Sequence, residues 1–130
     1  MKYIVTGSEG FIGKALCQRL GQSEVIRIDR KTGGDAALIE HLLARHDVDG
    51  VFHLAAETSV FNTRLEDIER ENVRVFIAVA KACDLHNVKL VYASSSTANP
   101  CNTTSMYGMT KRFNEQFAKV YCPNATGVRL

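Results

Sequence analysis

Three glycines near the N-terminus, Gly7, Gly10 and Gly13, constrain this 130-residue chain more than any other feature. They follow a short apolar run at residues 3–5 that is typical of a buried strand, and they precede residues 14–20, whose apolar positions have helical spacing. Glycine lets the backbone turn sharply, and it lets a phosphate approach bare N–H groups where the helix dipole favours negative charge. The stretch therefore predicts a strand–turn–helix unit that binds a phosphate group.

The next strand, expected over residues 23–29, ends in an acid, Asp29. In a dinucleotide-binding unit, an acid at this place accepts hydrogen bonds from the hydroxyls of the adenosine ribose and repels a 2′-phosphate. Asp29 therefore favours NAD. Arg30 and Lys31 follow immediately and could pair with that phosphate instead, so the sequence leaves NADP open.

The rest of the chain alternates between strand-like and helix-like segments. We expect helices over residues 36–46, 65–86 and 107–121, and strands over residues 49–56, 88–93 and 125–130. This order predicts one α/β domain over residues 1–130, with a doubly wound parallel sheet. The segment between Asp29 and Ala36 is too short for a further strand, so this edge of the sheet is expected to be trimmed to a loop. His53 lies inside an apolar strand and is predicted to be a hydrogen-bonded core histidine.

Composition narrows the function classes. The formal net charge of +2 gives no reason to expect a nucleic acid or an anionic membrane as partner. No apolar run approaches the roughly 20 residues that span a bilayer, and the N-terminus lacks a secretory pattern. The cysteines show no spacing typical of a metal site, so we expect reduced thiols in a cytoplasmic protein. They are Cys17, Cys83, Cys101 and Cys122.

Tyr107 and Lys111 carry the predicted chemistry. They stand four residues apart in an expected helix, so their side chains share one face. A phenol has a pKa near 10, and a cation beside it moves that pKa towards neutrality. A serine hydroxyl at the end of the preceding strand can bind the same substrate oxygen. Such a set suits the oxidation of an alcohol or the reduction of a ketone, with hydride exchanged with a nicotinamide.

Four segments, taken in order, resemble the extended short-chain dehydrogenase/reductase family, the NAD-dependent nucleotide-sugar epimerases and dehydratases. They are TGSEGFIG at residues 6–13, HLAA at 53–56 with Ser59 and Val60, VYASSS at 91–96, and YGMTK at 107–111. Asn72 matches an asparagine that the family carries in the helix before the serine-rich strand. The resemblance spans essentially the whole chain and implies a Rossmann-type fold.

The resemblance also implies a role for each matching residue. Tyr107 would be the catalytic acid–base, Lys111 would bind the nicotinamide ribose and lower the pKa of the tyrosine, and Ser96 would hold the substrate hydroxyl. Ser95 or Thr97 could take the place of Ser96. The implied cofactor is NAD, with NADP open, and the implied substrate is a nucleotide sugar. Cofactor contacts are expected from Gly7, Gly10, Phe11, Ile12, Gly13, Asp29, Arg30, Leu54, Ala55, Ala56, Asn72, Ser94, Tyr107 and Lys111.

Length is the main departure from the family, whose members usually run to more than twice 130 residues and bind the nucleotide sugar through a C-terminal region. We expect that region to be missing here. A small enzyme, a non-catalytic dinucleotide-binding or interaction module, and a product whose companion segment is encoded elsewhere all remain open, as do epimerisation, dehydration and reduction. Relatives dimerise through helices equivalent to residues 65–86 and 107–121, so a homodimer or larger assembly is expected.

Overall fold

The computed structural model describes residues 1–29, 36–58, 64–101 and 105–130. Five parallel strands form one sheet in the order β2-β1-β3-β4-β5, which confirms the predicted Rossmann-type α/β fold. The direction of winding changes between β1 and β3, and ligands of such sheets bind at that point, beyond the carboxyl ends of the strands. The strands are β1 (Lys2–Thr6), β2 (Glu24–Ile28), β3 (Gly50–His53), β4 (Lys89–Ser94) and β5 (Ala125–Arg129).

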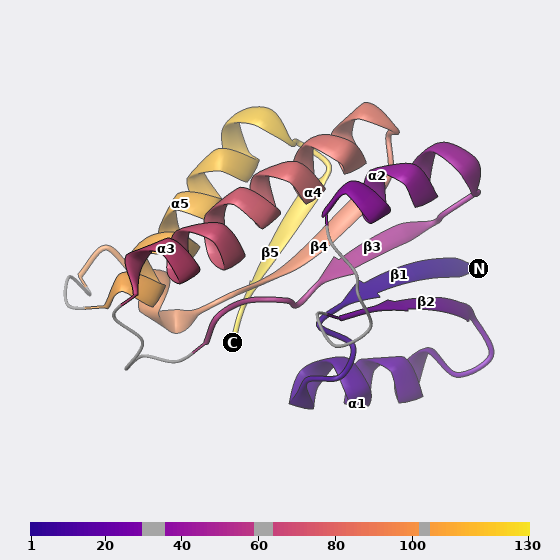
Figure 1. Ribbon diagram of the computed structural model, residues 1–130, viewed down its shortest axis with the longest axis horizontal. Coiled ribbons are helices and arrows are strands. Elements are labelled where there is room, and N and C mark those ends of the chain that lie inside the picture. The colour runs from indigo at the N-terminus through magenta and orange to yellow at the C-terminus, as the bar shows by residue number, and fades with distance from the viewer. Residues whose placement is uncertain (30–35, 59–63, 102–104) are drawn as a thin grey trace.

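Helices lie on both faces of the sheet but unequally. Helix α1 (Phe11–Leu20) lies on one face, and α2 (Ala36–Arg45), α4 (Val75–Leu85) and α5 (Met106–Tyr121) cover the other (Figure 1). The helix predicted over residues 65–86 forms in three parts, with a π-helical turn in the middle. These parts are α3 (Leu65–Ile68), the π-helix η2 (Glu69–Arg74) and α4.

The core fills the space between the sheet and the three-helix layer. Phe76 of α4 lies at its centre with 1% exposure, and its ring is 4.9 Å from that of Tyr92 and 6.3 Å from that of Phe117. In the sheet, Ile4 is in register with Val51 and Val51 with Leu90, and all three are buried. This packing fixes the positions of the strand ends that carry the candidate site.

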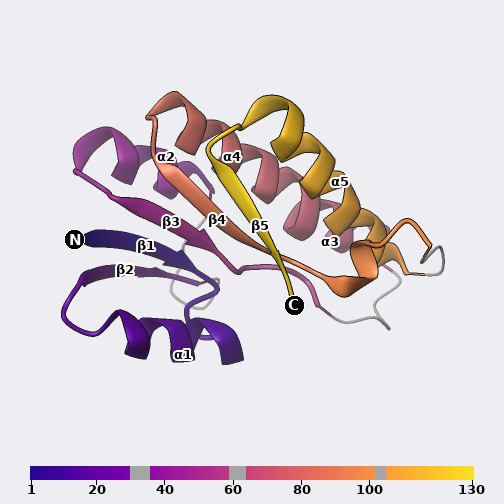
Figure 2. The same ribbon diagram turned by 180° about the vertical axis from the view of Figure 1, so that it is seen from behind.

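The opposite face of the sheet is only partly covered. Within the described ranges, α1 is the only helix there, and it lies beside β1 and β2, so β4 and β5 have no helix over them (Figure 2). Val128 is 43% exposed and Leu130 57% exposed as a result. Parallel sheets are nearly always covered on both faces, so this surface is suited to contact with further polypeptide.

Several element boundaries differ from the predicted ones by one to three residues, and helix α1 begins at Phe11. Strand β3 ends at His53, three residues early, and a short 3₁₀-helix, η3 (Ser96–Ala98), follows β4 where only a loop was expected. At the trimmed edge, β2 is the outermost strand of the described residues, as predicted, and residues 30–35 lie outside them. None of the described helices is both long and apolar enough to cross a membrane.

Candidate functional site

The glycine loop between β1 and α1 packs directly against the chain that leaves β3. Gly7 has a φ of +67°, and a Cβ on it would lie 2.8 Å from the backbone nitrogen of Ala55. A Cβ on Gly13 would lie 2.1 Å from the carbonyl oxygen of Gly7. Since these obstacles are backbone atoms, no side-chain movement could relieve them, and the loop requires glycine at both positions.

Helix α1 begins in a way that suits an anionic ligand. Its N-cap is Gly10, no side chain caps it, and its first turn contains no acid. Backbone N–H groups at such a helix start need a partner from outside the helix, and the helix dipole favours a negative one. The bare backbone of the loop and the uncapped helix start together fit a pyrophosphate.

A cavity of about 410 Å³ opens in front of the glycine loop. It brings together nine of the residues predicted to contact the cofactor: Gly7, Gly10, Phe11, Ile12, Gly13, Asp29, Leu54, Ala55 and Ala56. Four further lining residues, Glu9, Thr58, Glu71 and Ala93, were not predicted. A larger groove of about 830 Å³ lies among α2, α4 and α5, away from these motifs.

Asp29 lies at the mouth of this loop, as the sequence predicts for the acid that ends the second strand. Its Oδ2 accepts a hydrogen bond of 3.3 Å from the backbone N–H of Glu9. The hydroxyl of Ser8 donates to the carbonyl of Ile28 over 3.4 Å, which also ties the loop to the end of β2. Arg30 and Lys31, the alternative partners for a 2′-phosphate, lie outside the described residues.

Thr6 holds β1 and β3 together at the site. Its Oγ1 accepts hydrogen bonds from the backbone N–H groups of Leu54 (3.1 Å) and Ala55 (3.2 Å). Its own proton therefore goes to Nδ1 of His53, 2.8 Å away. Burial, with a smaller contribution from the charge of Lys111, lowers the pKa of His53 to about 3. His53 is thus a neutral, hydrogen-bonded core histidine, as predicted, and the prediction missed Thr6.

Tyr107 and Lys111 share a face of α5, as their spacing predicts. The Nζ of Lys111 lies 5.5 Å from the centroid of the Tyr107 ring and donates a 2.9 Å hydrogen bond to the carbonyl of Ala93. Lys111 is only 3% exposed, and burial lowers its pKa to about 8. Burial raises the pKa of the Tyr107 phenol, opposite to the effect expected of a neighbouring cation. The ammonium of Lys111 donates to a carbonyl, and burial sets the direction of the shift in the pKa of Tyr107.

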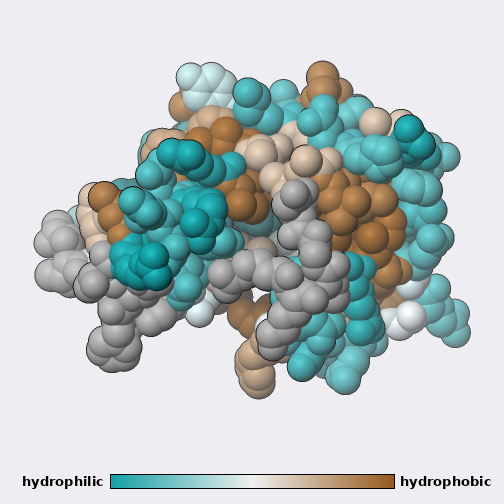
Figure 3. All heavy atoms as spheres, viewed as in Figure 1, coloured by the Kyte–Doolittle hydropathy of each residue, from teal (hydrophilic) through white to brown (hydrophobic). Residues whose placement is uncertain are grey.

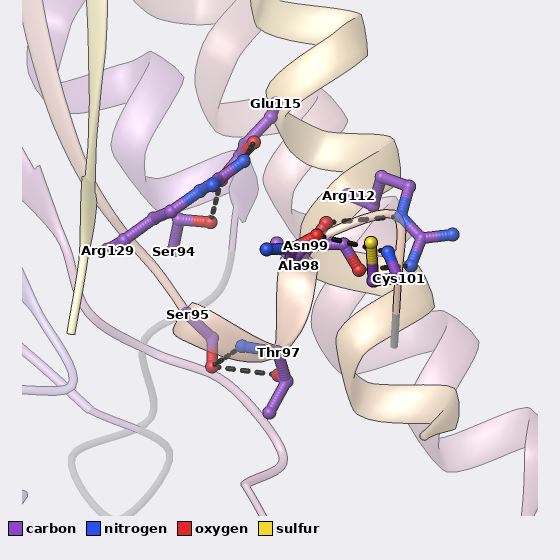
Figure 4. Close-up of polar contacts among 9 residues, drawn as sticks. All are labelled: Ser94, Ser95, Thr97, Ala98, Asn99, Cys101, Arg112, Glu115 and Arg129. Atoms are coloured by element: carbon purple, nitrogen blue, oxygen red, sulfur yellow. Dashed lines mark hydrogen bonds and ion pairs between the residues drawn. The ribbon is translucent and has the colours of Figure 1, made fainter. Parts of the chain in front are cut away.

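The serines at the end of β4 have different surroundings. Ser94 is buried and its hydroxyl donates to Glu115 on α5, so it points away from the cavity that the neighbouring Ala93 lines (Figure 4). Ser95 bonds the Thr97 hydroxyl over 2.8 Å and caps η3. Ser96 alone of residues 94–97 is exposed, and its role in holding a substrate hydroxyl stays a prediction.

Asn72 does not line the cavity but joins three segments around it. Its side-chain Oδ1 accepts a 2.7 Å hydrogen bond from the N–H of Glu57, and its Nδ2 donates to the carbonyl of the same residue. The Nδ2 also donates to the Thr110 hydroxyl, which in turn donates to the carbonyl of Tyr107 over 2.7 Å. Asn114 donates to the backbone carbonyl of Asn72 over 2.9 Å. This network places α5 against the chain beyond Ala56.

The fold and the glycine cradle define a dinucleotide-binding α/β protein. The family model of the NAD dependent epimerase/dehydratase family matches residues 3–130, so the chain belongs to that family. The UDP-2-acetamido-2,6-beta-L-arabino-hexul-4-ose reductase of Pseudomonas aeruginosa is 32% identical over 127 residues, which are 92% of this chain and 31% of that protein.

Solved structures with the same fold contain nicotinamide cofactors. The UDP-glucuronic acid 4-epimerase of Bacillus cereus, solved with NAD, is 27% identical with a TM-score of 0.84 over 99% of this chain and 55% of its own. The dTDP-4-dehydrorhamnose reductase of Bacillus anthracis, solved with NADP, is 25% identical with a TM-score of 0.84 over 98% and 52%. The chain thus spans about half the length of these solved relatives and about a third of the Pseudomonas reductase, and its family is NAD(P)-dependent.

Replacing Thr6 by valine should lower the free energy of unfolding by about 2–4 kcal/mol, because the Ala55 N–H and the Nδ1 of His53 lose their hydrogen-bond partner, while the Leu54 N–H keeps the Thr6 carbonyl. Thr6→Ser keeps the oxygen and should lose less than half as much. Urea unfolding measures both. A larger loss for Thr6→Ser than for Thr6→Val would show that the methyl group, not the hydroxyl, matters at this position.

The contribution of Lys111 to stability should rise with pH between about 8 and 10.5, because over that range the unfolded chain binds a proton at Lys111 that the folded chain does not. The gain attributable to Lys111 is at most about 3 kcal/mol. It is measured as the difference between wild type and Lys111→Met in urea unfolding at several pH values. Lys119→Met, an exposed position on the same helix, is the control. A difference that does not change with pH would contradict the prediction.

Proposed function

We propose that this chain provides the cofactor-binding and proton-transfer machinery of an NAD(P)-dependent enzyme of the nucleotide-sugar epimerase/dehydratase type. One observation carries the proposal: Ala93 lines the cavity in front of the glycine loop, and its carbonyl is the hydrogen-bond acceptor of Lys111. The cradle for a dinucleotide and the Tyr107–Lys111 pair therefore meet at one strand end. Binding and acid–base chemistry can act on the same molecule there.

Each residue then has a defined task. Residues 7–13 and the start of α1 bind the pyrophosphate, and Asp29 binds the adenosine ribose. The bound nicotinamide supplies the hydride acceptor or donor. Tyr107 transfers the proton of the substrate hydroxyl, and Ser96 orients that hydroxyl. Lys111, protonated at neutral pH, offers its N–H groups to ribose hydroxyls and its charge to the phenolate form of Tyr107.

The nature of the substrate is proposed from the relatives. The family model and the sugar-nucleotide names of the matched proteins support a nucleotide sugar. All four cysteines are free thiols, which fits a reducing compartment, and we place the protein in the cytoplasm. The alternative is a dinucleotide-binding module without catalysis. It is favoured by the open sheet face over β4 and β5 (Figure 2).

Tyr107→Phe should bind NADH within about twofold of wild type but turn over a nucleotide sugar at least about 100-fold more slowly, because only the proton-transferring oxygen is removed. NADH fluorescence titration gives the affinity, and product analysis on a set of UDP- and dTDP-sugars gives the turnover. Tyr121→Phe, 63% exposed on the same helix, is the control. Full turnover by Tyr107→Phe would refute the assigned chemistry. Failure of wild type to bind NADH or NADPH would leave the interaction module as the better account.

We further propose a homodimer or larger assembly through residues 65–86 and 107–121. Apolar residues gather over α2, α4 and α5 (Figure 3), and Leu85, Val120 and Tyr121 are 71%, 68% and 63% exposed. Val120→Glu should halve the mass measured by light scattering at micromolar concentration, because a charge would be buried in the interface. Val128→Glu, on the opposite face, should not change the mass. A wild-type mass of one chain would contradict the assembly.

A further inference from the structure

The chain around Ser96 is held by side chains of α5 on both sides of this residue. Before Ser96, the Nζ of Lys111 donates to the carbonyl of Ala93 over 2.9 Å, and the carboxylate of Glu115 accepts a hydrogen bond from the Ser94 hydroxyl. Lys111 and Glu115 stand four residues apart, so they share one face of α5. This face fixes the end of β4.

After Ser96, the chain is held by Arg112. Its Nε donates to the carbonyl of Ala98 over 3.1 Å, and its Nη2 donates to the carbonyl of Asn99 over 2.9 Å (Figure 4). These two carbonyls lie at the end of the 3₁₀-helix η3, where carbonyl groups need a partner from outside the helix. A guanidinium holds its N–H groups in a rigid plane, so one side chain binds both carbonyls at once.

The first turn of α5 also packs against η3. A Cβ on Gly108 would lie 2.4 Å from the carbonyl oxygen of Thr97, so the two backbones are in close contact. Gly108 follows Tyr107 directly, and Arg112 stands four residues further on, on the same side of the helix as Gly108. Backbone packing and the guanidinium therefore hold η3 against the part of α5 that carries the tyrosine.

The backbone of Ser96 takes part in two hydrogen bonds. Its N–H donates to the carbonyl of Leu130 over 3.1 Å, and its carbonyl accepts from the N–H of Asn99 over 3.3 Å. The residue itself is exposed. The position of its hydroxyl is therefore set through the backbone of η3. Asn99 links this backbone to Arg112, because its N–H binds Ser96 and its carbonyl binds the guanidinium.

We propose that Arg112 is a positioning residue that sets the place of the Ser96 hydroxyl relative to the phenol of Tyr107, an inference that rests on the function proposed above. Arg112 belongs to the same helix as Tyr107 and binds the chain that carries Ser96. Without its two hydrogen bonds, the last carbonyls of η3 lose their anchor on α5. A displacement of about 1 Å near a reacting group can cost on the order of 100-fold in rate.

The test is the effect of Arg112→Met on the turnover of a nucleotide sugar in two backgrounds. In the wild-type background, kcat should fall at least about tenfold, while the dissociation constant for NADH stays within about twofold because the glycine loop is untouched. In the Ser96→Ala background, the same change should cost less than about twofold, because the hydroxyl that Arg112 positions is absent. An equal loss in both backgrounds would overturn the proposal, and so would full turnover by Ser96→Ala.

Matched variants and a second measurement separate positioning from a general loss of structure. Arg112→Lys keeps the charge but reaches only one carbonyl, so it should recover part of the lost turnover. Arg45→Met removes an exposed arginine from α2 and should keep the wild-type turnover. In hydrogen exchange, the N–H groups of Ser96 and Ala98 should exchange about tenfold faster in Arg112→Met, whereas those in the middle of α5 should keep their rates.

The outcomes separate this inference from the proposed function. A wild type that turns over a nucleotide sugar, with equal turnover by Arg112→Met, overturns the positioning role and leaves the proposed function intact. A wild type that binds neither NADH nor NADPH overturns the proposed function, and the positioning role falls with it. Hydrogen exchange requires no substrate, so unchanged rates at Ser96 and Ala98 in Arg112→Met would overturn the proposal even where no tested sugar is turned over.

Discussion

The close contact between the glycine loop and the chain leaving β3 is the constraint on which the site depends. Gly7 and Gly13 are held against backbone atoms, of Ala55 and of Gly7 itself, at distances that no Cβ could occupy. Thr6 fixes the other side of this contact by accepting two backbone hydrogen bonds from the β3 exit. The shape of the cofactor cavity is therefore set mostly by backbone, which explains why it can be rigid within so small a domain.

A second set of polar contacts holds α5 in position next to the chain that leaves β3. The side chain of Asn72 binds the backbone of Glu57, and Thr110 and Asn114 bind Asn72 from α5. Polar placement of this kind has a cost in stability: Lys111 is buried with a lowered pKa, and no partner is described for the Oδ1 of Asn114. Buried polar groups with such a cost in stability are usual at functional sites, and here they cluster around the Tyr107–Lys111 pair.

Periodicity and glycine spacing were enough to predict the order of elements and the site at the first strand. They could not predict that β3 ends at His53. The N–H of Leu54 is shared between the carbonyl and the hydroxyl of Thr6, and the N–H of Ala55 donates to that hydroxyl alone, which an apolar run does not reveal. The sequence pattern also did not predict the π-helical turn, nor that Glu71 of this turn lines the cavity. The direction of the Ser94 side chain could have been predicted: Tyr92 and Ser94 alternate with Ala93, so the serine faces the helices and not the cavity that Ala93 lines.

Helices cover one face of the sheet, whereas the other face is uncovered over β4 and β5. Glu115 pairs with Arg129 through two hydrogen bonds of 2.8 and 2.9 Å, which ties β5 to α5 and completes the helical side (Figure 4). The Tyr107–Lys111 pair belongs to that completed side, whereas the glycine loop leads into α1 on the other face. On the other face, β4 and β5 are uncovered, and the exposed Ser96 follows β4 at the same end of the sheet. Further polypeptide over this open face would therefore border the strand end at which the carbonyl of Ala93 holds Lys111 of α5.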